Sequence, residues 1–308
     1  MFRLIFTIIF LFFLSDSFAQ TNLLNAETPD QIELSENEEE NNELLKYEKI
    51  EPENVLWSKV VYEYIDLYQK LNYPLLYPTK DGNFRESRKS LWKTISDGIF
   101  DGSITELYKP GPGGDKFLGT LKIVDVDSTY YDDVKDYFTD NEYRDGKGRI
   151  ASSSLGEKLS SEDILGYNIK GIWYFDKLHS ELRYRLLGIQ PFGNDIKDKI
   201  ESNLKSRDIK KSEYPWIWYP SIREVLHKTK VFNDRNNNNR ISFDDLLVNR
   251  RFSSYIYKYD NVYGDRKIKE YIVKRDSETD YQHQLRLLME SERIKKEILD
   301  FEIDMWGY

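Results

Sequence analysis

LGYNIKGIWYFDKLHSELRYRLLGIQ, residues 165–190, carries the clearest strand pattern in the chain. Apolar and aromatic side chains alternate with polar ones in both halves: Tyr167, Ile169, Trp173 and Phe175 in the first half, and Leu182, Tyr184 and Leu186 in the second. Alternation with a period of two is typical of a strand with one buried face. The short polar segment DKLHS separates the two runs. The stretch therefore predicts an antiparallel hairpin.

Helical and short strand patterns lie on the N-terminal side of this hairpin. We expect a helix over residues 54–72, ended by Tyr73-Pro74, because apolar side chains recur there at helical spacing: Leu56, Val60, Tyr64, Leu67 and Leu71. A second helix is expected over residues 87–100, ended by Asp101-Gly102. Residues 102–108 and 119–127 favour strands, with GPGGD, residues 111–115, as a loop between them.

Helices dominate the C-terminal third. We expect one over residues 221–230, one from Phe243, and a long one over residues 281–305. The last carries an apolar stripe: Leu287, Ile294, Ile298, Phe301 and Met305. Strands and helices without regular alternation predict an α+β fold, with helices flanking an antiparallel sheet that contains the hairpin and a long C-terminal helix.

The first 53 residues differ in composition from the rest. Residues 1–19 have one basic residue, an apolar run from Leu4 to Leu14, and small residues at Ser17 and Ala19, which predicts a secretory signal peptide. The apolar run is shorter than the about 20 residues that cross a bilayer, so we expect no membrane span. Residues 20–53 hold eleven acidic residues against two lysines, and we expect a disordered leader there. Residues 54–308 form the expected domain, with a polar connector at 151–163 as a possible internal boundary.

Charge and cysteine content exclude several classes of protein and site. The net charge of −9 lies entirely in the acidic leader, and residues 54–308 are formally neutral, so a nucleic-acid-binding protein is not expected. The chain has no cysteine, which excludes disulfides, thiolate metal sites and a lipid-bearing cysteine. The three histidines are scattered, and neither a GxSxG nor a phosphate-loop pattern occurs. The catalytic motifs that the sequence offers are therefore few, and we expect no bound cofactor.

VFNDRNNNNRISFDDLL, residues 231–247, resembles a twelve-residue calcium loop. The ligands would be the side chains of Asp234, Asn236, Asn238, Ser242 and Asp245 and the carbonyl of Arg240. The closing residue is Asp where the longer Glu is usual, and no second loop is present to pair with this one. An Asn- and Asp-rich turn that caps the helix from Phe243 explains the same residues. We favour the capping turn and keep calcium as the alternative.

PWIWYP, residues 215–220, is the most aromatic short stretch. Trp216, Trp218 and Tyr219 could stack on a sugar or anchor a protein partner, because Trp and Tyr concentrate in binding hot spots. The alternative is that the two tryptophans fill the core beneath the following helix. If these aromatic residues do not fill the core, we expect Trp216, Trp218 and Tyr219 to bind a partner. A protein partner is favoured over a small ligand.

Six blocks of the sequence, in this order, together carry a family resemblance. They are WSKVVYEYIDLYQKLNYPLLYP, RKSLW, YNIKGIWYFDKLHSELRYRLLGIQP, WIWYPSIREVLHKTKVFN, ISFDDLLVNRRFSSYIYKYDNVYGDRKIKEYI and ESERIKKEILDFEIDMWGY. They extend from about Trp57 to the C-terminus, and the combination of FDD, R-x-F-x-SYI, D-R and a terminal E-x-D-x-W is specific. In this combination the chain resembles the GldN/PorN family of gliding-motility proteins. The resemblance implies a non-enzymatic, periplasmic component of the type IX secretion and gliding machinery.

The resemblance also implies the partners and the location. These are an outer-membrane lipoprotein of the GldK/PorK type, the periplasmic part of the GldL/GldM-type motor, and other copies of the chain in a ring beneath the outer membrane. A lipoprotein partner that carries the anchor is consistent with the missing lipid cysteine. The alternatives are a periplasmic carbohydrate- or peptidoglycan-binding module that uses the PWIWYP aromatics, and a calcium-dependent binding protein.

Overall fold

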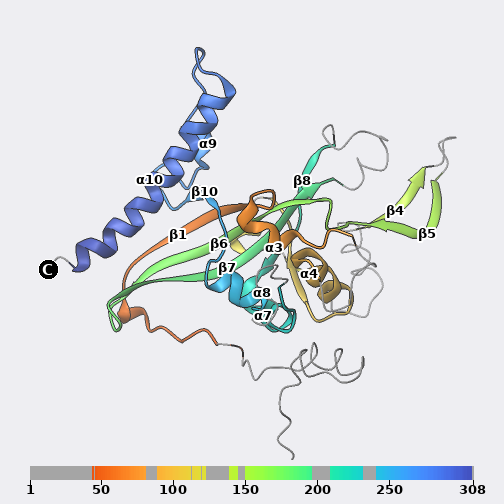
Figure 1. Cartoon of the computed structure of the whole chain (residues 1–308), viewed down its shortest axis with the longest axis horizontal. Helices are drawn as coiled ribbons and strands as arrows, with labels where there is room; N and C mark the ends of the chain where they lie inside the picture. Colours follow the sequence, from red (N-terminus) through yellow and green to blue (C-terminus); the bar gives the residue numbers. More distant parts are fainter. Residues whose placement is uncertain are drawn as a thin grey trace, which may run out of the picture. The chain divides into compact units, whose positions relative to one another are not determined.

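The fold is organised by a long antiparallel sheet. The computed structural model describes residues 44, 46–80, 89–111, 113–118, 120–122, 139–144, 150–195, 209–231 and 241–306, and gives only the backbone of 120–122, 139–144, 150–158 and 306. Within these residues one sheet has the order β10-β1-β6-β7-β9-β2-β3, and β8 also pairs with β7 (Figure 1). The bounds of its strands are β1 Val55–Asp66, β2 Glu106–Tyr108, β3 Thr120–Lys122, β6 Ile164–Asp176, β7 Glu181–Asn194, β8 Lys211–Glu213, β9 Trp216–Trp218 and β10 Tyr255–Tyr259.

The central hairpin is the one that the sequence predicts. Strands β6 and β7 pair antiparallel, with Ile169 opposite Ile189, Trp173 opposite Tyr184, and Phe175 opposite Leu182. The register shifts between Lys170 and Gly171. Glycine is needed at Gly171 because a Cβ there would lie 2.0 Å from the Tyr184 hydroxyl oxygen. The hairpin follows from the alternation of side chains between the two faces of a pleated strand. The predicted α+β class is confirmed.

The helix predicted over residues 54–72 is wrong. This segment forms β1, which pairs with β10 on one side and β6 on the other. Burial follows a period of two, with Val61, Glu63 and Ile65 fully covered, while Leu56 at one end is exposed. Branched and aromatic residues fit a pleated sheet surface, and two partner strands outweigh the helical spacing that the same apolar residues also satisfy. The proline expected to end the helix instead lies in the first turn of a short helix, α3 (Tyr73–Leu76).

One face of the sheet is covered by helices α4 (Leu91–Phe100), α7 (Tyr219–Lys228) and α8 (Phe243–Val248) (Figure 1). All three lie where helices were predicted. The Ser90 hydroxyl accepts from the Lys93 amide at 3.0 Å and starts α4, which ends before Asp101-Gly102 as expected. We call the buried cluster that these helices share with the sheet the main core; among its fully covered residues are Ile65, Tyr167, Ile189, Ile222 and Phe243.

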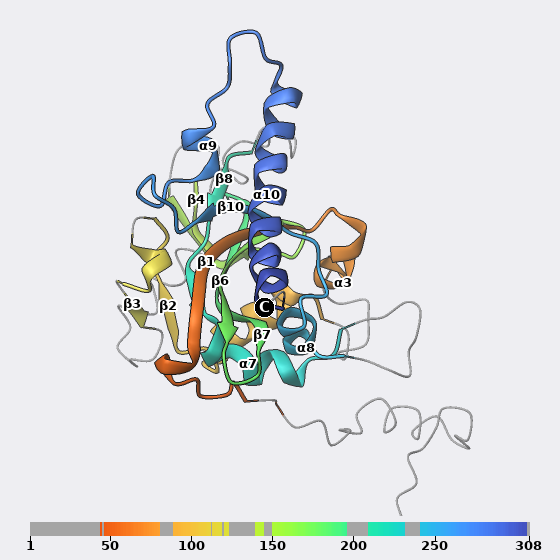
Figure 2. The same ribbon diagram turned by 90° about the vertical axis from the view of Figure 1, so that its left-hand side faces the viewer.

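The long C-terminal helix α10 (Asp280–Trp306) packs at the other end of the sheet, with the short helix α9 (Ile268–Tyr271) before it (Figure 2). Its predicted stripe is confirmed in its central part, because Ile294 and Ile298 are buried against Val61, Ile256, Tyr259 and Ile268. We call this second group the edge cluster. The Ile256 amide on β10 donates to the Ser291 hydroxyl of α10 at 2.7 Å, so the helix covers part of the free edge of the sheet.

Smaller elements complete the comparison with the sequence. The strand predicted over 102–108 is confirmed as β2, and the one over 119–127 is confirmed at β3; residues 119 and 123–127 lie outside the described part. The polar connector expected at 151–163 is wrong for most of its length. There β5 (Ile150–Lys158) pairs with β4 (Thr139–Arg144) in a separate two-stranded sheet. Among the described helices, none has the length and apolar character needed to span a membrane.

Candidate interaction surface

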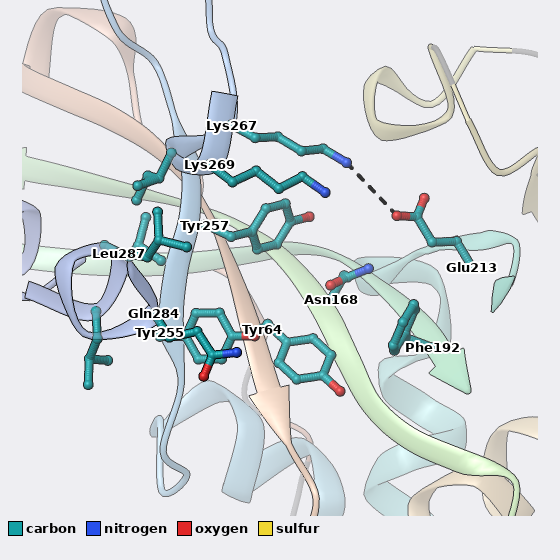
Figure 3. A pocket seen from close by; sticks show the side chains of 13 residues that line it. Tyr64, Asn168, Phe192, Glu213, Tyr255, Tyr257, Lys267, Lys269, Gln284 and Leu287 are labelled. Carbon is teal, nitrogen blue, oxygen red and sulfur yellow. Dashed lines mark ion pairs between the residues drawn. The ribbon is translucent and has the colours of Figure 1, made fainter. Parts of the chain in front are cut away.

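A groove of about 610 Å³ lies on the sheet, beside β10 and the α9–α10 region (Figure 3). Strands and helices that are distant in sequence supply its walls. The central strands contribute Tyr64, Asn168 and Phe192, β8 contributes Glu213, β10 contributes residues 255–257, and the helices contribute residues 267–269, Gln284, Leu287 and Leu288. The antiparallel pairing of β1 with both β6 and β10 brings the tyrosines of β1 and β10 together.

The floor of the groove is aromatic. The Tyr64 ring contacts the Phe192 ring edge-on, with ring centres 5.8 Å apart, and it lies 5.4 Å from the Tyr255 ring. Burial raises the pKa of the Tyr64 hydroxyl well above its ordinary value, so the side chain is neutral at physiological pH. Aromatic side chains that pack against one another while keeping part of their surface open are suited to receive apolar groups of a partner.

Two lysines and one glutamate set the charge at the rim. The Lys267 ammonium nitrogen is 3.9 Å from a Glu213 carboxylate oxygen, the outer limit of an ion pair, and Figure 3 shows this pair bridging the top of the groove. Lys269 projects over the same opening, is exposed, and has no ion pair within the part of the chain that the structure describes. An apolar floor with a cationic rim favours a partner segment that presents apolar side chains beside carboxylates.

A network of charged and aromatic groups continues from the groove along the same face of β1. The Lys258 ammonium donates to the Asp115 carboxylate at 2.6 Å and lies 4.3 Å from the centre of the Tyr62 ring. Lys170 donates to the Asp115 carbonyl oxygen at 2.7 Å. Both lysines are therefore held by the short helical turn that contains Asp115 (Gly114–Lys116), and the face beside the groove is fixed before any partner arrives.

The PWIWYP aromatics are divided between the core and the surface. Trp216 and Tyr219 are buried, and the Tyr219 hydroxyl donates to the Asp244 carboxylate at 2.8 Å. Trp218 is half-buried and packs edge-on against Phe117, with ring centres 4.7 Å apart. Burial supports the core role for Trp216 and Tyr219, so any contact made by this stretch would use Trp218. Interaction through the three residues stays a prediction.

Only part of the candidate calcium loop is described. Asp234, Asn236, Asn238 and Arg240 lie outside the described residues. Ser242 and Asp245 form a capping box at the start of α8: the Asp245 amide donates to the Ser242 hydroxyl at 3.0 Å, and that hydroxyl donates to the Asp245 carboxylate at 2.7 Å. This geometry supports the capping turn, because both residues already have partners within one helical turn.

One group of possible metal ligands lies close to this capping box. His227, Asp244 and Asp245 offer ligand atoms within 4.8 Å of one another. However, Arg223 donates to both oxygens of the buried Asp244 carboxylate, at 2.9 and 2.8 Å. A guanidinium cation already compensates this carboxylate, which disfavours a second cation at the same place. We therefore assign this group to the packing of α7 against α8.

Sequence reasoning missed the groove. Its residues come from separate strands and helices, and none of these short segments carries a ligand-binding motif. The available signal was the tyrosine-rich run SYIYKYD at 254–260, which shows strand alternation but does not reveal which strand lies beside it. The prediction of a helix over residues 54–72 also hid the role of Tyr64, because a helix would not place that side chain opposite Tyr255.

Comparison with known proteins adds one finding. The family model described as "Gliding motility associated protein GldN" matches residues 50–307. The match includes the whole described sheet, the groove and all of α10. No curated protein matches the chain.

Proposed function

This chain belongs to the GldN family of gliding motility associated proteins, and we propose that it is a non-enzymatic structural subunit of the type IX secretion and gliding machinery. The observation that carries the proposal is the family match over residues 50–307, which contains every element of the main sheet. Membership associates the chain with gliding motility and type IX secretion. The assembly, the partners and the location are the parts that we propose.

The proposed assembly is a ring in the periplasm, peripheral to the outer membrane. After removal of the signal peptide expected at residues 1–19, the chain associates with an outer-membrane lipoprotein of the GldK/PorK type, which carries the lipid anchor. It also contacts the periplasmic part of the GldL/GldM-type motor and other copies of itself. The groove lined by Tyr64, Tyr255 and Tyr257 supports this proposal because it offers a partner aromatic surface together with the positive charge of Lys269, which has no ion pair among the described residues.

The native size of the protein in a mild-detergent extract of the cell envelope tests the proposal. We expect a species far larger than one chain that contains the lipoprotein, with the same size in the presence of a calcium chelator. A monomer under both conditions would contradict the ring and favour a carbohydrate- or peptidoglycan-binding module. Collapse of a large species on chelation would favour the calcium-dependent alternative.

A charge reversal in the groove tests whether this surface takes part. We expect Lys269→Glu to reduce the amount of the large species without lowering the thermal stability of the isolated chain, because Lys269 is exposed and forms no ion pair among the described residues. Lys177→Glu is the matched control. It makes the same change of charge at an exposed lysine in the β6–β7 turn, at the opposite end of β6 from the groove residue Asn168. Equal effects of the two variants would assign the change to net charge and not to the groove.

A further inference from the structure

Helix α10 carries two apolar stripes, and the part of the chain that the structure describes buries only one of them. The inner stripe faces the edge cluster through Ile294 and Ile298. The outer stripe consists of exposed side chains at helical spacing on the opposite side: Tyr281, Leu285, Met289, Leu299 and Ile303. Met289, Leu299 and Ile303 are 64, 52 and 59% exposed. Most surface helices present charged and polar residues on the side away from the core, so this second stripe indicates a partner.

The outer stripe is long enough for a helix-to-helix contact. From Tyr281 to Ile303 it extends over about 33 Å at 1.5 Å per residue. Figures 1 and 2 show α10 projecting beyond the sheet at one end, so that end is accessible from more than one side. A straight amphipathic helix of this length is commonly buried by a second helix packed along it.

Two opposite charges interrupt the stripe at its middle. Glu292 and Lys296 lie four residues apart on the outer side, between the apolar groups at 281–289 and 299–303. Both are exposed. Glu292 pairs with Lys295 at 2.9 Å, whereas Lys296 has no ion pair within the described residues. The order along the stripe is therefore apolar, negative, positive, apolar. Read in the reverse direction, the same order is apolar, positive, negative, apolar.

We propose that the outer stripe of α10 packs antiparallel against the same stripe of a second copy of this chain. With Glu292 of each copy beside Lys296 of the other, two equivalent ion pairs form at the centre. The same register places Met289 opposite Leu299 and Leu285 opposite Ile303, so apolar side chains meet on both sides of the charges. A two-fold contact of this kind is self-complementary, which is the arrangement that most symmetric protein pairs use.

The charges select this register over its neighbours. A shift that places Glu292 opposite Glu292, or Lys296 opposite Lys296, brings like charges together at the centre of the contact. A parallel arrangement in register does the same at both positions. Only the antiparallel register with Glu292 opposite Lys296 satisfies both charges and both apolar groups, which is why the occupant is a second copy and not an unspecified helix.

The inference specifies one self-contact of the assembly in the proposed function, but its support is the surface of α10 alone. A two-fold contact joins two copies and closes on itself. A ring therefore needs another interface as well. The groove is lined mainly by the strands, and the residues of α10 that it includes, Gln284, Leu287 and Leu288, are not part of the outer stripe. The pairing of α10 and the formation of the envelope complex can thus fail independently.

Charge exchange within one chain is the first test, measured by sedimentation of the purified protein over a range of concentrations. Glu292→Lys and Lys296→Glu should each weaken the pair by about tenfold or more, because each places like charges together twice. The double variant, which exchanges the two charges, should restore pairing close to that of the unchanged protein. Failure of the double variant to recover would overturn the antiparallel register, as would a monomeric unchanged protein.

Engineered cysteines provide the second test, made clean by the absence of natural cysteine. Chains with Met289→Cys are mixed under oxidising conditions with differently tagged chains that carry Leu299→Cys. We expect a disulfide between the two kinds of chain and little between chains of one kind, because facing positions approach to disulfide distance while like positions lie far apart. A disulfide among Met289→Cys chains alone would indicate a parallel pair and contradict the proposal. Both side chains are exposed, so unchanged thermal unfolding is the check that the fold is intact.

The proposed function is tested by a different measurement from the α10 pairing, namely the native size of the envelope complex. Suppose that the Glu292→Lys variant is monomeric when purified but still forms the large complex in the envelope. The pairing of α10 would then be supported as a property of the free protein. This result would also show that the envelope assembly rests on other surfaces. A large complex with no α10 disulfide in any mixture would overturn the inference and leave the proposed function standing.

Discussion

At the scale of single residues, a buried ion pair connects β1 to the segment that follows α8. Glu63 on β1 is covered, and Arg250 donates to its two carboxylate oxygens at 3.0 and 2.7 Å, while the Ser254 hydroxyl also donates to it. The Arg250 guanidinium lies 4.2 Å from the centre of the Tyr184 ring. Although burial disfavours the charged arginine, Glu63 raises the pKa of Arg250 above its ordinary value. This pair fixes the segment after α8 against the central strands.

Removing one partner of this pair should be costly. We expect Glu63→Gln to lower the free energy of unfolding by about 3–5 kcal/mol, because it leaves a largely buried guanidinium without a counter-charge. Denaturant unfolding followed by circular dichroism measures the change. Lys274→Met, which breaks an exposed pair with Asp280, is the control and should cost less than about 1 kcal/mol. A loss for Glu63→Gln no larger than for the control would show that the buried pair adds nothing to stability.

The Asp115–Lys258 pair predicts a dependence on pH. Burial raises the pKa of the Asp115 carboxyl, but the hydrogen bond and charge of Lys258 outweigh this, and the net pKa is below its ordinary value. A carboxyl with a lowered pKa in the folded state stabilises the fold above its unfolded pKa of about 4, and this contribution is lost as the pH falls through the folded value.

We therefore expect the difference in melting temperature between the unchanged protein and Asp115→Asn to shrink as the pH is lowered from 6 towards 3. Thermal unfolding at a series of pH values measures this difference. A difference that stays constant over the range would contradict the assignment of the lowered pKa to this ion pair.

At the scale of elements, the sequence predicts best where one pattern excludes the others. The β6–β7 hairpin was predictable because alternation over two long runs has no helical equivalent. Helices α4 and α8 are marked by caps and α10 by a long apolar stripe. Strand β1 was not predictable, since Val60, Tyr64 and Leu67 satisfy helical spacing as well as strand composition. Its pairing with both β6 and β10 decides the outcome, and neither contact is visible in the segment itself. The groove has the same origin, because Tyr64 and Tyr255 meet only through this pairing.

The capping box of α8 separates the two interpretations of the loop before it. Ser242→Ala should lower the free energy of unfolding by about 1 kcal/mol through loss of the cap, by the same amount with calcium and with a chelator. Thermal unfolding under both conditions measures this. If the loop binds calcium instead, the unchanged protein should melt higher with calcium, and Asp234→Ala should abolish that rise.

At the scale of the whole molecule, the main core and the edge cluster predict two regions of different stability. The edge cluster consists of fewer buried side chains and holds β10 and α10 against β1. Ile294→Ala should remove about 2–5 kcal/mol of stability from this cluster. We expect hydrogen exchange to accelerate first in β10 and least in the part of β7 that faces the main core.

Ile222→Ala, on the buried side of α7, is the matched control because it removes the same atoms from the main core. It should accelerate exchange throughout the sheet. Identical exchange patterns for the two variants would show that the sheet opens as one cooperative unit.

The length of the central strands has a mechanical consequence for a protein of a family associated with gliding motility. β6 and β7 remain paired from Ile164 to Asp176, and β1 pairs with β6 from Val55 to Asp66. Ladder hydrogen bonds run perpendicular to the strands. Traction applied along the strands therefore loads the whole ladder in shear, whereas traction across them would peel it one bond at a time. A chain built on these strands resists pulling best when the line of force follows β1, β6 and β7.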